Sequence, residues 1–98
     1  MNDFQHGSSQ RIGESLQNAG INVEFASVQG NREAYFRAAF DLGADSFEVY
    51  IYADEIGLMA NGKHWRIWER PDFDGPDELL ADFMENLSEL TNDQPSND

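Results

Sequence analysis

The chain contains no cysteine and has few basic residues. The absence of cysteine excludes disulfides, thiol nucleophiles and cysteine-based zinc sites, and it fits a reducing compartment. Only 6 Lys and Arg residues stand against 19 Asp and Glu residues, so the formal net charge is −13. Such a charge repels nucleic acid and anionic membranes, and it attracts basic partners. A nucleic-acid-binding role is therefore disfavoured.

Long hydrophobic runs are also missing. No apolar stretch reaches the roughly 18–20 residues that a membrane-spanning helix requires, and the opening MNDFQHGSSQ lacks the pattern of a secretory signal. We therefore expect a cytoplasmic protein without a membrane segment. With 98 residues, 40% of them hydrophobic, the chain has the size and composition of a single domain, residues 1–98, with a modest core.

No motif in the chain names a reaction. There is no phosphate-binding loop, no GxGxxG and no GxSxG. The run DFDGPDE (72–78) partly matches a calcium loop, but aligning Gly75 with the sixth loop position puts Arg70 and Ala81 where carboxylates are required. A histidine-based site would depend on His64, because the other histidine, His6, lies near the chain start. We expect no enzyme activity, no metal and no cofactor.

Two segments have helical periodicity. In residues 8–19 the apolar positions Ile12 and Leu16 share one face, and Gly20 follows as a helix stop. In residues 76–90 Pro76 suits the first helical position, and an apolar stripe runs along one side. That stripe consists of Leu79, Leu80, Phe83, Met84, Leu87 and Leu90. The polar ends, 1–7 and 92–98, are predicted to be disordered tails.

The middle of the chain alternates apolar and polar residues with the period of β-strands. Gly30-Asn31 and Asn61-Gly62 predict two-residue hairpin turns. Between residues 53 and 56 the apolar positions change from odd to even numbers, which requires a two-residue turn at Asp54-Glu55 or a bulge. These turns set Phe25 opposite Phe36 and Leu58 opposite Trp65. In the same pattern, placing Phe40 beside Phe47 matches Ala38 to Val49.

This register makes one sheet face apolar throughout. Its predicted members are Ile21, Val23, Phe25, Phe36, Ala38, Phe40, Phe47, Val49, Ile51, Leu58, Trp65 and Ile67. The sequence therefore predicts a two-layer α+β domain in the order α-β-β-β-(β)-β-α. Four or five strands form an antiparallel meander, and an N-terminal and a C-terminal helix pack on its apolar face.

The opposite face is the candidate interaction face. Its candidate residues are Tyr35, Arg37, Tyr50, Tyr52, Met59, His64, Arg66 and Trp68. Tyr, Trp, Met and Arg are enriched at the centres of protein interfaces, so we expect a protein partner or a second copy in a homodimer. A small-ligand or single-stranded nucleic-acid platform is a further reading, although the net charge opposes phosphate. The alternative without a function is a solvent-exposed face on which Tyr and Trp occur because they favour β-strands.

All charged residues from position 71 onward are acidic. The predicted C-terminal helix thus offers a second candidate surface, which would bind a basic partner. Its residues are Asp77, Glu78, Asp82, Glu85 and Glu89. In size, acidity and element order, with no shared motif, the chain is similar in type to small secretion chaperones, immunity or antitoxin proteins and small orphan proteins of mobile bacterial gene cassettes. An acidic inhibitor or chaperone is therefore the alternative function.

The two tryptophans receive different expectations. Trp65 is placed in the core, so Trp65→Ala should cost about 3–5 kcal/mol. Trp68 is placed on the outer face, so Trp68→Ala should leave the fold intact and remove an external contact.

Overall fold

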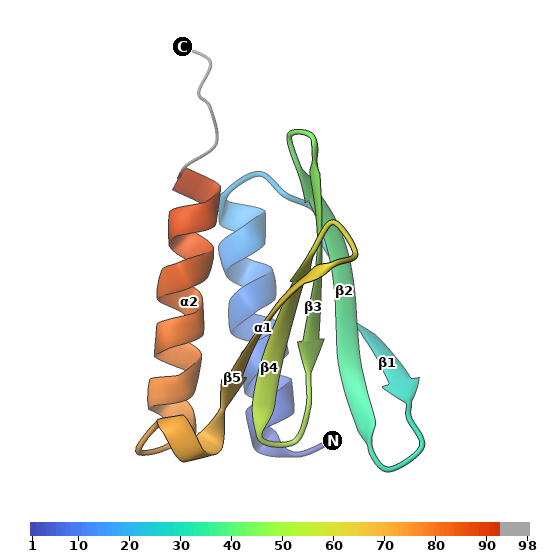
Figure 1. The fold of residues 1–98 in the computed structure, drawn as a ribbon, viewed down its shortest axis with the longest axis vertical. Coiled ribbons are helices and arrows are strands. Elements are labelled where there is room, and N and C mark those ends of the chain that lie inside the picture. The colour runs from blue at the N-terminus through green and yellow to red at the C-terminus, as the bar shows by residue number, and fades with distance from the viewer. Residues whose placement is uncertain (93–98) are drawn as a thin grey trace.

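The structure, a computed structural model, describes residues 1–92. Its elements are α1 (Asp3–Asn18), β1 (Ala26–Gln29), β2 (Ala34–Leu42), β3 (Asp45–Ile51), β4 (Glu55–Ala60), β5 (His64–Glu69), the 3-10 turn η1 (Arg70–Asp72) and α2 (Pro76–Asn92). The five strands form one antiparallel sheet in the order β1-β2-β3-β4-β5. Both helices lie on one face of this sheet (Figure 1). This is the predicted two-layer α+β arrangement.

Helix α1 begins earlier than predicted, because the residues before it form a cap. The Asn2 side chain accepts a hydrogen bond from the Gln5 backbone N–H at 2.9 Å, and the Gln5 side chain accepts from the Asn2 N–H at 3.0 Å. This reciprocal pair is a capping box. The buried Gln5 amide also donates to the carbonyl oxygens of Ala34 and Ile51. The predicted N-terminal tail is therefore wrong from residue 3; most of the predicted C-terminal tail, 93–98, lies outside the described residues.

The central strands pair as predicted. Phe40 lies opposite Phe47, and Ala38 lies opposite Val49. The change of parity before β4 is also present, with Val49 opposite Leu58. The Tyr52 N–H donates to the Glu55 carbonyl at 2.9 Å, so the turn comprises residues 53–54, one position earlier than expected.

The first strand differs from the prediction. Residues 21–25 lie outside the sheet, and β1 pairs Ser27 with Phe36, where the sequence pattern had placed Phe25. The connection to β2 is a four-residue loop, 30–33, closed by a hydrogen bond from the Gly30 N–H to the Glu33 carbonyl at 3.1 Å. The register moves by two residues, so odd-numbered residues still face the helices, but in β1 these are Ser27 and Gln29. Phe25 still packs edge-on against Phe36, with ring centroids 6.4 Å apart.

The last strand is inverted relative to the prediction. Asn61 and Gly62 form the expected turn, with positive φ angles of 54° and 73° and a hydrogen bond from the Lys63 N–H to the Ala60 carbonyl. However, the ladder resumes with His64 opposite Ala60, which leaves Lys63 as an extra, unpaired residue. Such a bulge shifts the register by one, and a one-residue shift turns every side chain to the other face.

The predicted outer-face positions of three residues are therefore wrong. His64, Arg66 and Trp68 share the helix side with Leu58, whereas Trp65 and Ile67 turn outward. Trp68 is 4% exposed and meets the ring of Phe83 edge-on at 4.9 Å.

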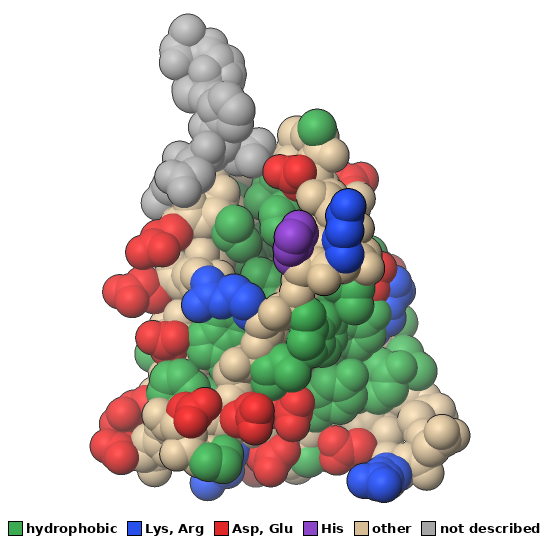
Figure 2. Space-filling view, in the orientation of Figure 1, with side chains coloured by type: hydrophobic (Ala, Val, Ile, Leu, Met, Phe, Trp, Pro, Cys, Tyr) green, Lys and Arg blue, Asp and Glu red, His purple; other side chains and the backbone are tan. Residues whose placement is uncertain are grey.

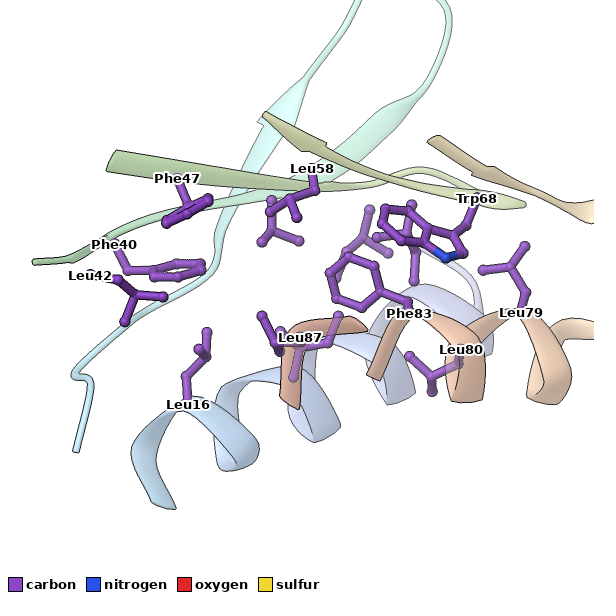
Figure 3. Close-up of a cluster of buried hydrophobic side chains, with 14 residues drawn as sticks. Leu16, Phe40, Leu42, Phe47, Leu58, Trp68, Leu79, Leu80, Phe83 and Leu87 are labelled. Atoms are coloured by element: carbon purple, nitrogen blue, oxygen red, sulfur yellow. The ribbon is translucent and has the colours of Figure 1, made fainter. Parts of the chain in front are cut away.

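The core fills the space between sheet and helices (Figure 3). Trp68 reaches down from the sheet toward Phe83 and Leu79 of α2. The fully enclosed apolar residues are Ile12, Leu16, Val49, Ile51, Ile56, Leu79, Phe83 and Leu87. They come from both helices and from strands β3 and β4, so the two layers share one core.

Candidate functional site

The outer side of the sheet, away from the helices, has an aromatic surface built from four strands. We call it the aromatic face, and it comprises Tyr35, Tyr50, Tyr52, Met59, Trp65 and Ile67. The predicted members Tyr35, Tyr50, Tyr52 and Met59 all lie there. Trp65 and Ile67 were missed, because the Lys63 bulge is not visible in the alternation.

The three tyrosines form a continuous cluster. Tyr35 lies 5.1 Å from Tyr52 and 6.0 Å from Tyr50 between ring centroids. Tyr50 and Tyr52 are nearly parallel, with an interplanar angle of 6° and a centroid distance of 6.3 Å. Contacts of this kind add to area burial and hold the rings in place. The cluster is therefore a preformed surface.

Trp65 extends this surface toward β5. Its ring meets Tyr50 edge-on at 5.3 Å and lies across Gly57 of β4. A Cβ atom on Gly57 would stand 2.8 Å from Trp65 Cζ2, so the glycine is what allows this ring position. Trp65 and Ile67 are 40% and 41% exposed, the highest values for large apolar side chains in residues 2–92.

A polar network borders the tyrosines. The Arg37 guanidinium lies 3.2 Å from the Glu48 carboxylate, the Tyr50 hydroxyl donates to the other oxygen of that carboxylate, and Arg37 Nε donates to the Tyr50 hydroxyl at 3.4 Å. The hydrogen bond from Tyr50, together with Arg37, lowers the pKa of Glu48. The same carboxylate raises the pKa of Tyr50, so the phenol stays protonated. The three groups satisfy one another.

The face is less basic than predicted. Arg37 is on it but is paired with Glu48. Arg66 lies on the helix side, with its guanidinium 4.9 Å from the ring centroid of Trp68. His64 also belongs to the helix side of β5. The exposed part of the aromatic face is therefore apolar.

Carboxylates gather at one end of the face. Glu55 and Glu69 are opposite each other in β4 and β5, and Asp54 and Glu33 are near enough to repel Glu55. Burial, followed by the charges of Glu69, Asp54 and Glu33, raises the pKa of Glu55. Arg37–Glu48 is the one salt bridge within residues 1–92, so these four carboxylates have no ion-pair partner there. Figure 2 shows the acidic row directly below the hydrophobic patch.

A hollow adjoins the tyrosines at the same end of the face, beside the loop that joins β1 and β2. It has a volume of about 510 Å³ and lies between the loop 30–33 and the rings of Tyr35 and Tyr52. Arg32 and Glu33 both line it, so its charge is mixed.

The predicted acidic surface of α2 is present and exposed. Its members Asp77, Glu78, Asp82, Glu85 and Glu89 are all exposed. Asp82 also has a structural contact, because it accepts a hydrogen bond from Trp68 Nε1 at 2.8 Å. The remaining four extend along the helix, and no large apolar side chain of α2 is as exposed as Trp65 or Ile67.

Comparison with known proteins gives no relative: no family model, no curated protein and no solved structure matches this chain. Within the described residues, neither helix is long and apolar enough to cross a membrane. The same residues contain no group of three His, Asp or Glu side chains that could hold a metal ion. The proposal of a function therefore rests on the chemistry of the aromatic face.

Proposed function

We propose that this protein is a non-enzymatic interaction module, which binds a basic protein partner through the aromatic face. The observation that carries the proposal is the exposure of Trp65 and Ile67, 40% and 41%, beside a preformed tyrosine cluster. Large apolar side chains surrounded by half-buried aromatic rings are typical of interface centres.

Charge favours a basic partner over a second copy. The chain has a net charge of −13, and Glu55 and Glu69, at the end of the face, have no ion-pair partner within residues 1–92. A partner with Lys or Arg beside its apolar contacts would neutralise these carboxylates, whereas a second copy would add like charge. An apolar centre with a charged rim is the usual composition of such an interface.

The polar network on the face supports binding more than catalysis. Arg37, Glu48 and Tyr50 bond to one another, and their pKa shifts keep Glu48 ionised and Tyr50 protonated. A general acid or base needs a pKa near the working pH. These shifts move the pKa values of Glu48 and Tyr50 further from neutral pH. The network is therefore suited to holding the ring of Tyr50 in place.

Site-specific photocrosslinking followed by calorimetry tests the proposal. A photoreactive phenylalanine analogue at position 65 should capture the partner in cells, and the analogue at position 10, exposed on α1, should not. With the purified pair, Trp65→Ala should weaken binding by about 10-fold or more, as is typical of a hot spot. Gln10→Ala is the matched control and should bind as the wild type does.

Two results would contradict the proposal. One is a purified complex whose affinity ignores Trp65→Ala and Ile67→Ala but falls with Glu85→Lys, which would move the interface to the acidic surface of α2. The other is a stable homodimer in light scattering that dissociates on Trp65→Ala, which would make the occupant a second copy.

A further inference from the structure

We infer that the partner binds as an extended segment that adds a sixth strand to the sheet along β5. The inference rests on the proposed function and specifies how the same face is used. The occupant is a segment of another protein, with apolar residues that meet Trp65 and Ile67 and basic residues that meet the carboxylates of Glu55 and Glu69.

The edge of β5 is open. In residues 1–92 this strand pairs with β4 alone, and of its six residues only Trp68 is buried. Figure 2 shows a strip of bare backbone at the edge where Figure 1 draws β5. An edge strand presents unpaired N–H and C=O groups, which an incoming extended chain can pair with. The backbone therefore supplies a generic docking edge.

The two edges of the sheet are not equivalent. β1 has only four residues, whereas β5 has six and every one of them is paired with β4. The two most exposed apolar side chains of the aromatic face, Trp65 and Ile67, also belong to β5. Directly opposed side chains on neighbouring strands lie about 4.5–5.5 Å apart. An added strand would thus cover both side chains and continue the aromatic face.

Charge fixes the composition of the occupant. Glu69 follows Ile67 by two residues, so it lies on the same face of β5, and Glu55 is its cross-strand neighbour. A basic residue on the added strand, two positions from the apolar residue that meets Ile67, would lie beside Glu69, with Glu55 one strand further into the sheet. Arg66 does not oppose it on this face, because its guanidinium stacks on Trp68 on the other side of the sheet.

A second copy fits this edge poorly. If two β5 strands paired antiparallel about Ile67, Trp65 of one chain would face Glu69 of the other, and neither Glu69 would meet a cation. The pairing would also join two chains with a charge of −13 each.

A symmetric synthetic peptide is the probe. Acetyl-KTVTVTK-amide places Lys, Val, Val and Lys on one face in either strand direction. We expect the peptide to shift the indole N–H signal of Trp65 in a ¹H–¹⁵N correlation spectrum. The indole signal of Trp68, which is hydrogen-bonded to Asp82, should not shift. The outward-facing amides of β5 should exchange at least about 10-fold more slowly with deuterium, as new hydrogen bonds require. Peptides with Glu for Lys, or with N-methylated valines, should bind at least about 10-fold more weakly.

The outcomes separate this inference from the proposed function. A Trp65 shift without protection of β5 amides, or equal binding of the N-methylated peptide, overturns strand addition and leaves the aromatic face as the interface. Equal binding of the Glu peptide, or no loss of affinity in Glu69→Gln relative to the control Glu14→Gln, overturns the charge requirement. Absence of any binding by the peptide at millimolar concentration also overturns strand addition, while the crosslinking at position 65 judges the function independently.

Discussion

The indole Nε1–H of Trp68 donates a hydrogen bond to a carboxylate oxygen of Asp82, 2.8 Å away. This contact joins the edge strand β5 to the exposed side of α2. It accompanies the edge-on packing of Trp68 on Phe83, and both require β5 to present its even-numbered residues to the helices. The contact of strand and helix therefore determines which side of β5 is the aromatic face.

Trp68→Ala should destabilise the fold by about 3–5 kcal/mol, because it removes a 4%-exposed aromatic ring from the core. Trp65→Ala is the matched control, in the same strand, and should cost less than about 1 kcal/mol, since that ring is 40% exposed. Urea unfolding followed by far-UV circular dichroism measures both. If Trp65→Ala lowered the free energy of unfolding more than Trp68→Ala, the β5 register expected from the sequence would be correct. Trp65 would then lie in the core and not on the aromatic face.

Gly57→Ala should destabilise the protein by about 1–3 kcal/mol, because the new Cβ would lie 2.8 Å from Trp65 Cζ2 and force the indole off the strand. The same change in a Trp65→Ala background should cost clearly less, since the obstructing ring is absent. A double-mutant cycle by urea unfolding measures the coupling between the two positions. Equal costs in both backgrounds would show that Trp65 does not rest on Gly57 in solution.

The sequence predicted the strand pairing correctly where the hydrophobic pattern of two neighbouring strands favours one register. Phe40 and Phe47, and likewise Ala38 and Val49, pair as expected, because a shift by one residue would place polar residues in the core. It also placed Tyr35, Tyr50 and Tyr52 on the outer face correctly. For these strands the hydrophobic alternation contains enough information.

Alternation failed for β5 because both of its sides carry large apolar residues. Trp65 with Ile67 looks more apolar than Arg66 with Trp68, so the pattern favoured the wrong side. The deciding contacts, Trp68 with Phe83 and Asp82, join residues 14 or more positions apart and depend on how α2 packs. The one local indication of the true arrangement was Gly57, a glycine inside a strand, where a large neighbouring ring can lie.

Two carboxylates should give opposite pH dependences of stability. The pKa of Glu55 is raised by burial and by nearby acidic groups, so its ionisation opposes folding at neutral pH. Glu55→Gln should therefore raise the free energy of unfolding at pH 7. This gain should disappear as the pH falls through the raised pKa and below the ordinary value of 4.5. Urea titrations between pH 3 and pH 8 measure the difference.

Glu48→Gln is the counterpart. The hydrogen bond from Tyr50 and the charge of Arg37 lower the pKa of Glu48, so the ionised carboxylate stabilises the folded state. That contribution is present above the ordinary value of 4.5 and is lost as the pH falls through the lowered pKa. The variant should be less stable than wild type at pH 7, and the difference should shrink in acid. The same sign for both variants at pH 7 would contradict the electrostatics described for the face.

Deletion of Lys63 tests what determines the register of β5. Lys63 is the unpaired residue between the turn Asn61-Gly62 and the ladder, so its removal lets His64 follow the turn directly and still pair with Ala60. Asn-Gly is a favoured two-residue hairpin turn. We therefore expect the deletion variant to keep Trp68 in the core and to change the free energy of unfolding by less than about 1.5 kcal/mol.

The tryptophan side-chain signals report the result. If the core determines the register, one indole N–H should remain protected from exchange in the deletion variant, as Trp68 is in the wild type, and the other should stay exposed. Insertion of a second residue beside Lys63 should likewise enlarge only the bulge, because a strand that slipped by one would lose the contact of Trp68 with Asp82. Exposure of both indoles in either variant would show that the turn, and not the packing of β5 on α2, sets the face that this strand presents.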